Sequence, residues 1–179
     1  MSIQILDGRG RGFLAEVDSE GHLIVDAIQL SELAHTSVAH GLAFSWAAAT
    51  YDYDASDTIL LVKNTSSTRK LLIEQIIISS DTATEVAIHV PTSEVTPSGT
   101  TITGRNMNLG SNNVAEATAV RDETNNSQGN LFWTGFISAN EAHHVDFQGA
   151  LILGTNDSIG VDLVTAGTGC ACTIFGLFE

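Results

Sequence analysis

The sequence predicts an all-β protein, an antiparallel sandwich around one core. Short apolar runs rich in Val, Ile, Thr and Phe recur about every 8 to 14 residues, with Gly, Asn, Ser and Asp between them, as in sandwiches and barrels. No gap holds a convincing crossover helix, so we expect antiparallel connections. With 179 residues, the chain is long enough for a sizeable core. The expected strands lie near 13–17, 22–26, 42–49, 58–63, 70–79, 84–91, 100–104, 113–119, 131–138, 147–153, 158–164 and 169–178.

The N-terminal part differs from the rest, and we divide the chain into an arm and hairpin (1–40) and a sandwich domain (41–179). The run Gly8-Arg9-Gly10-Arg11-Gly12 is too rich in glycine for a regular element, so the chain should begin as an extended arm. The pattern of 15–25 predicts a hairpin around Ser19-Glu20-Gly21. A short helix is the candidate structure for 28–36.

The predicted strands are of two kinds, those with one apolar face and those with two. In 84–90 and 158–164 apolar and polar residues alternate, which indicates one buried and one solvated face. In 71–78, 131–137 and 174–178 both faces are apolar, so each strand needs a second cover. A neighbouring subunit is the simplest cover, and we expect an oligomer; the alternative is that a loop or the N-terminal segment of the same chain lies over the sheet.

Charge and hydropathy narrow the classes of partner. Only 16% of the residues are charged, so the chain has either a large core or a surface that partners cover. The net charge of -14 repels phosphate backbones, and we expect no nucleic-acid partner. No apolar stretch is long enough for a signal peptide or a membrane helix, which predicts synthesis in a cytoplasm without export and no membrane partner.

Candidate metal sites are weak. Asp52, Asp54 and Asp57 could supply oxygen ligands to Ca²⁺, but the glycine and the later Glu of an EF-hand loop are missing, which favours a solvated acidic turn. The six histidines include no His-x-His pair, and His143 and His144 would face opposite sides of a strand. We therefore predict no metal and no cofactor.

Candidate catalytic residues are equally sparse. Cys170 and Cys172 share a strand face at a spacing awkward for a mutual disulfide, and small buried hydrophobes are the favoured interpretation. The chain contains no Gly-x-Ser-x-Gly elbow and no phosphate loop. A pair of glycosidase carboxylates stays open among 21 acidic residues, although 6% aromatic content is low for a sugar-cleaving cleft. We expect no enzymatic activity.

In four stretches the chain resembles small structural proteins of tailed bacteriophages that are encoded near head genes. These stretches are 15–25, then 43–46 with 57–66, then 99–103 with 106–109, and 149–154 with 157–161. The resemblance implies a jelly-roll sandwich that forms a homotrimer and serves as a capsid decoration (cement) protein, with the major capsid protein or another virion protein as partner. It brings no active-site residues.

This resemblance places the protein in the virion, assembled in the bacterial host cytoplasm. Residues 1–40 would contact the shell or a neighbouring subunit, and the strands that are apolar on both faces would meet along a three-fold axis. The residues we expect at these interfaces are Arg9, Arg11, Leu23, Val25, Ile76, Ile78, Trp133, Phe175 and Phe178. The alternatives are a receptor- or glycan-binding module of a tail or fibre, whose pockets would lie in the loops of 105–130, and an enzyme of the cupin or glycosidase kind.

Overall fold

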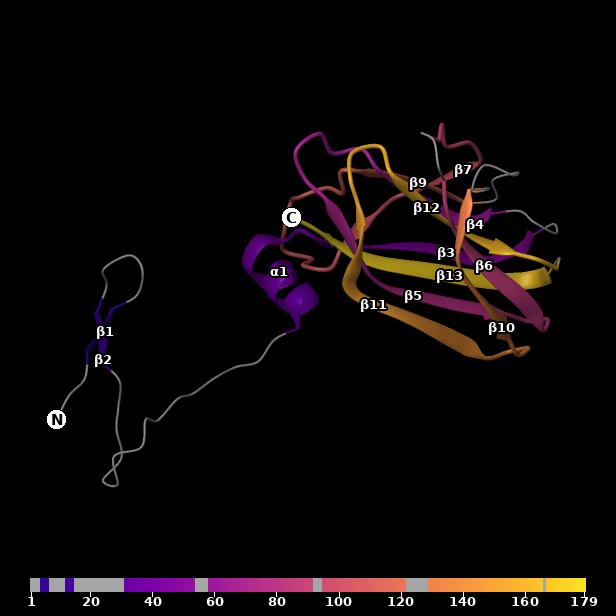
Figure 1. Cartoon of the computed structure of the whole chain (residues 1–179), viewed down its shortest axis with the longest axis horizontal. Helices are drawn as coiled ribbons and strands as arrows, with labels where there is room; N and C mark the ends of the chain where they lie inside the picture. The colour runs from indigo at the N-terminus through magenta and orange to yellow at the C-terminus, as the bar shows by residue number, and fades with distance from the viewer. Residues whose placement is uncertain are drawn as a thin grey trace, which may run out of the picture. The chain divides into compact units, whose positions relative to one another are not determined.

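The computed structural model divides the chain into two compact units, residues 1–31 and residues 32–179 (Figure 1). It describes residues 4–6, 12–14, 31–53, 58–91, 95–121, 129–165 and 167–179. In the first unit, β1 (Gln4–Leu6) and β2 (Gly12–Leu14) pair antiparallel, with Ile5 opposite Phe13. The second unit contains the sandwich.

This strand pair corrects our expectation for the first 12 residues. We expected an irregular arm there because glycine resists ordering, whereas short apolar segments on both sides of the glycine-rich run form a ladder. Of the glycine-rich run itself, only Gly12 lies within the described residues, where it pairs with Leu6. The hairpin that we predicted in 15–25 lies outside the described residues.

Helix α1 (Glu32–His40) opens the second unit and begins four residues later than the predicted 28–36. Gly41 ends it in the left-handed conformation, with φ of 60°. Its N–H donates to the carbonyl of Ser37 at 3.0 Å, and the N–H of Leu42 donates to that of Thr36 at 3.5 Å, so two backbone bonds close the helix end. A Cβ at Gly41 would lie 2.7 Å from the Cβ of Ser111, so this glycine also permits a close approach of a loop.

The sandwich is a jelly roll, which confirms the predicted all-β fold class. One sheet has the order β11-β5-β13-β3-β8 and the other β10-β6-β12-β4-β9-β7, with antiparallel neighbours. Among the eight strands β3–β6 and β10–β13, successive strands lie in opposite sheets except β6 and β10, which are neighbours in one sheet. Each four-stranded set has the jelly-roll order. The strands are β3 (Ala43–Tyr53), β4 (Thr58–Asn64), β5 (Leu71–Ser80), β6 (Thr84–Val90), β7 (Thr100–Ile102), β8 (Arg105–Asn106), β9 (Ala117–Arg121), β10 (Asn130–Ile137), β11 (Ala142–Leu153), β12 (Ser158–Leu163) and β13 (Gly167–Phe178).

The three strands β7, β8 and β9 are an insertion between β6 and β10. They extend both sheets at the edge far from β10 and β11, as Figure 1 shows with β7 and β9 on the upper side and β10 and β11 on the lower side. Only short strands, of three and two residues, therefore end the sheets at the insertion, which limits unpaired backbone there. At the other edge the sheets end in the longer β10 and β11.

The apolar character of both faces of β5 has two explanations within the subunit. A bulge shifts the register between Ile73 and Gln75, so that Ile76 and Ile78 face the same interior as Leu71 and Ile73. On the outer face, Leu72 packs with Ala43, Leu177 and Leu33, and Leu33 belongs to α1. The N-terminal helix thus covers part of the sheet, which was our alternative to a neighbouring subunit.

Three residues expected at the subunit interface belong to the core instead. Ile76, Ile78 and Phe178 are almost completely buried among the apolar side chains between the sheets. The sequence pattern misplaced the two isoleucines because period-two counting does not foresee a bulge. Phe178 packs edge-on against Phe44, with ring centroids 5.7 Å apart.

Candidate interaction surface

Candidate metal ligands do not gather into a site in the described part of the chain. Among these residues, no group of three or more His, Cys, Asp or Glu could hold a metal ion. The side chains of the weak calcium candidate, Asp52, Asp54 and Asp57, lie outside the described residues.

The histidines and cysteines have structural surroundings. His143 packs against the ring of Trp133, with centroids 5.5 Å apart, and the Nε2 atom of His89 lies 3.4 Å from a carboxylate oxygen of the buried Asp162. Cys170 and Cys172 are free thiols in the core, as the sequence indicated. Burial raises the pKa of the Cys172 thiol far above its ordinary value, so this thiol is neutral and a poor nucleophile.

One cavity of about 400 Å³ lies between α1 and the end of β13. Its wall contains His35 and His40, whose rings meet edge-on with centroids 5.8 Å apart, together with Leu42 and Glu179. The volume suits a small ligand. Two imidazoles and one carboxylate give few convergent polar groups, so the cavity supports binding better than catalysis.

The most unusual described surface is the edge strand β10. Three of its apolar side chains are exposed: Phe136 by 70%, Leu131 by 57% and Phe132 by 51%. We call these three residues the β10 patch. Long exposed edges of this kind usually carry charged residues or proline, whereas 130–137 contains neither. A partner that covers the strand would remove these apolar side chains from water.

The β10 patch is held in place from behind. Trp133 is half-buried against the core, and Ile137 belongs to it. Phe132 reaches across to Phe147 of β11, with ring centroids 5.8 Å apart. A bulge at Phe132 breaks the ladder between β10 and β6, which turns this ring out of the regular alternation.

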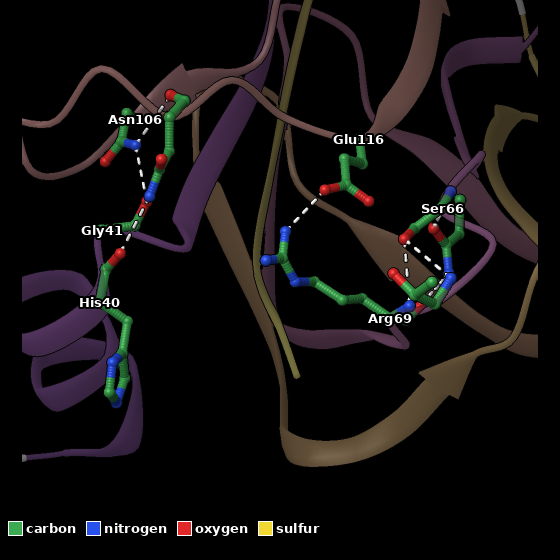
Figure 2. Close-up of polar contacts among 9 residues, drawn as sticks. His40, Gly41, Ser66, Arg69, Asn106 and Glu116 are labelled. Carbon is green, nitrogen blue, oxygen red and sulfur yellow. Dashed lines mark hydrogen bonds and ion pairs between the residues drawn. The ribbon is translucent and has the colours of Figure 1, made fainter.

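A second candidate surface is the loop after β8. Hydrogen bonds from asparagine side chains hold this loop against the end of α1. The amide of Asn106 donates to the carbonyl of Gly41 at 2.8 Å, as Figure 2 shows. Asn108 donates to the carbonyl of Ser37 at 3.2 Å, and Asn113 to that of His40 at 3.0 Å. The last carbonyls of a helix lack partners within it, and Asn113 supplies one to His40, the last residue of α1.

Apolar side chains emerge from this fixed loop. Leu109 is 94% exposed, Val114 79% and Met107 40%. We call these three residues the loop patch. The loop patch was not expected, because the asparagine-rich composition of 105–130 indicated polar loops alone. The available signal was three apolar residues in a run, 106–114, that contains no charge.

The remaining predicted interface residues have mixed positions. Trp133 is half-buried and packs against the core next to the β10 patch, and Phe175 is half-buried on β13, opposite Gln75 in the ladder. The other four lie outside the described residues: Arg9, Arg11, Leu23 and Val25.

Comparison with known proteins adds no relative. No protein-family model matches the chain, and no curated protein or solved structure is significantly similar to it. Within the described ranges, none of the helical segments has the length and hydropathy to cross a bilayer.

Proposed function

We propose that this chain is a structural protein of a tailed-phage virion, a capsid decoration (cement) protein that bridges capsomers as a homotrimer and stabilises the head. The observation that carries the proposal is the β10 patch. Three exposed apolar side chains on an uncharged jelly-roll edge strand are typical of a surface that another protein covers, which supports the proposal. The proposal assigns no enzymatic activity to the chain and names the major capsid protein, or another virion protein, as its second partner.

The charge distribution supports this function. A decoration protein must stay soluble before it binds, and a net charge of -14 opposes nonspecific association. It must also present uncharged surface where it meets its partners, since charges are depleted at interface centres. The sequence combines a strongly acidic balance with the uncharged runs 106–114 and 130–137.

Two measurements test the proposal. Light scattering on the purified chain should give three times the 18.9 kDa mass of the monomer. Antibody labelling of purified virions in the electron microscope should then place the protein on the head, in a copy number that fits the three-fold positions of the shell. A monomer that labels no virion would refute the proposal.

The second candidate is a receptor- or glycan-binding module of a tail or fibre. The cavity between α1 and β13 favours it, because about 400 Å³ is enough for a monosaccharide-sized ligand. Label at the tail tip, together with a glycan-array signal that a His35→Ala substitution in the cavity wall removes, would select this function over the first.

A further inference from the structure

The carboxylate of Glu85 lies among exposed apolar residues on the outer face of the six-stranded sheet. Glu85 precedes Val86, which packs between the sheets, so the Glu85 side chain points away from the core. In the ladder Glu85 is directly opposite Phe136 of β10, which is 70% exposed. On its other side, the carbonyl of Glu85 accepts from the N–H of Val164 at 2.9 Å, and Val164 is 46% exposed. Two exposed apolar residues therefore flank one negative charge.

A hydrogen bond holds this carboxylate over the edge strand. The hydroxyl of Thr134 in β10 donates to Oε1 of Glu85 at 2.6 Å, so the Glu85 side chain leans toward the free edge of the sheet. In the part of the chain that the structure describes, Glu85 forms no ion pair. A carboxylate that accepts one hydrogen bond keeps lone pairs for further donors, so this group is positioned and still able to bind a cation.

The strands around Glu85 supply no cation of their own. The neighbouring strands β10, β6 and β12 contain Glu85 and Asp162 but no Lys or Arg. Asp162 is opposite Ala87 in the ladder, so it lies on the same face as Glu85, although it is buried beside His89. The face is thus acidic as well as apolar, on a chain with a net charge of -14. Its electrostatic complement is a cation that also carries apolar surface.

Arginine satisfies both requirements better than lysine. Residues directly opposite each other in a ladder have Cβ atoms about 5 Å apart, so one guanidinium can contact Phe136 and Glu85 together. Its plane stacks on the aromatic ring while its N–H groups donate to the carboxylate. A lysine ammonium is a compact and strongly hydrated charge, which matches a ring face less well.

The backbone of β10 indicates the form of the partner. Among the described strands, β10 pairs with β6 and ends the sheet, and its register from Trp133 to Ile137 is regular. An extended segment can add to such an edge as the next strand, with main-chain hydrogen bonds for affinity and alternate side chains for specificity. The side chain opposite Thr134 in the added strand would lie on the outer face, toward which Glu85 leans.

We propose that the edge of β10 binds an extended segment of another protein by strand addition, and that an arginine of this segment stacks on Phe136 and pairs with Glu85. The inference goes beyond the proposed function, since it concerns a partner other than the chain itself and requires neither a trimer nor a virion.

Titration of the full chain with dye-labelled peptides tests the inference by fluorescence anisotropy. The probe is a short synthetic peptide with one arginine between alternating threonine and valine residues. In the matched peptide, citrulline replaces the arginine, which removes the charge and keeps the shape. We expect the arginine peptide to bind about tenfold more tightly than the citrulline peptide. A third peptide, methylated on alternate backbone nitrogens that would donate to β10, should bind much more weakly than the first.

Two variants of the chain locate the contact. Glu85→Gln removes the charge at an exposed position and should abolish most of the preference for arginine. Glu116→Gln is the matched control, because it changes the net charge equally and lies next to β9, away from β10 in the sheet, so it should keep the preference. Equal loss in the two variants would overturn the inference in favour of general attraction to an acidic chain. Absence of binding, equal binding of the arginine and citrulline peptides, or unchanged binding of the methylated peptide would overturn it too. Mass measurement and virion labelling would decide the proposed function independently.

Discussion

Asn106→Ala tests whether the asparagine bonds to α1 shape the interaction surface. The Asn106 amide donates to the carbonyls of Gly41 at 2.8 Å and Asn113 at 3.1 Å, and its side-chain oxygen accepts from the N–H of Asn108 at 2.9 Å. At about 1 kcal/mol for each bond, the three sum to about 3 kcal/mol. Because Asn106 is half-buried, water replaces part of the lost hydrogen bonding, and we expect the free energy of unfolding to fall by about 2 kcal/mol.

A matched control separates this local effect from general destabilisation. Asn64 also makes three side-chain hydrogen bonds, donating to the carbonyls of Arg69 and Leu153 at 3.0 Å each and accepting from the N–H of Ser66 at 2.9 Å. Asn64 is completely buried, so Asn64→Ala leaves its former hydrogen-bond partners without access to water. We expect the free energy of unfolding to fall by about 3 to 4 kcal/mol. Asn64 lies in neither patch.

Urea unfolding followed by tryptophan fluorescence measures both losses, and light scattering over a dilution series measures assembly. We expect opposite rankings: Asn64→Ala loses more stability yet assembles normally, whereas Asn106→Ala loses less and dissociates at higher concentration, because its loop patch is no longer held. Equal dissociation of the two variants would mean that assembly follows global stability, and the reasoning about the loop would be refuted.

Four further predictions concern other parts of the molecule. Gly41→Ala should destabilise the fold by about 1 to 2 kcal/mol in urea unfolding, because alanine is strained at a φ of 60° and would contact Ser111. Arg69→Ala should cost less than about 1 kcal/mol, since the ion pair with Glu116 that Figure 2 shows is part-exposed; a larger loss in the same assay would contradict this. The Cys172 thiol should resist a thiol reagent until urea unfolds the chain, because it is buried. Burial raises the pKa of this thiol in the folded state, so its contribution to the free energy of unfolding is complete below the ordinary thiol pKa and falls as the pH rises above that value. Self-assembly should tighten as NaCl rises, because salt screens repulsion between acidic copies, whereas binding to a basic partner would weaken in the same titration.

The sequence predicted the sandwich well because its strands follow simple rules. The predicted 58–63 and 84–91 agree closely with β4 and β6, where turn residues bound short β-branched runs. The predicted 147–153 found only the second half of β11. In the first half, the exposed His144 and Asp146 flank the buried Val145, and a bulge with positive φ at Gln148 and Gly149 divides the strand.

The interaction surface was harder to predict than the fold. The apolar composition of 131–137 was evident from the sequence, which left open whether another subunit or the same chain covers the strand. In the structure α1 covers part of the other sheet, and three apolar side chains of β10 are exposed. The loop patch depends on contacts between Asn108 and Ser37, 71 residues apart in the chain. Periodicity carries no information about such side-chain bonds, so a polar composition concealed a fixed apolar surface.

The electrostatics of the chain constrain how any assembly can form. Buried ion pairs across an interface would need basic residues, and only seven Lys and Arg face 21 Asp and Glu in the whole sequence. One of these seven, Lys63, is buried and donates to the carbonyl of Val95, and Arg69 is paired with Glu116. Copies of this chain therefore have few cations with which to attract one another. Association between them must come from apolar packing, and among the described residues such packing is available at β10 and at the loop after β8.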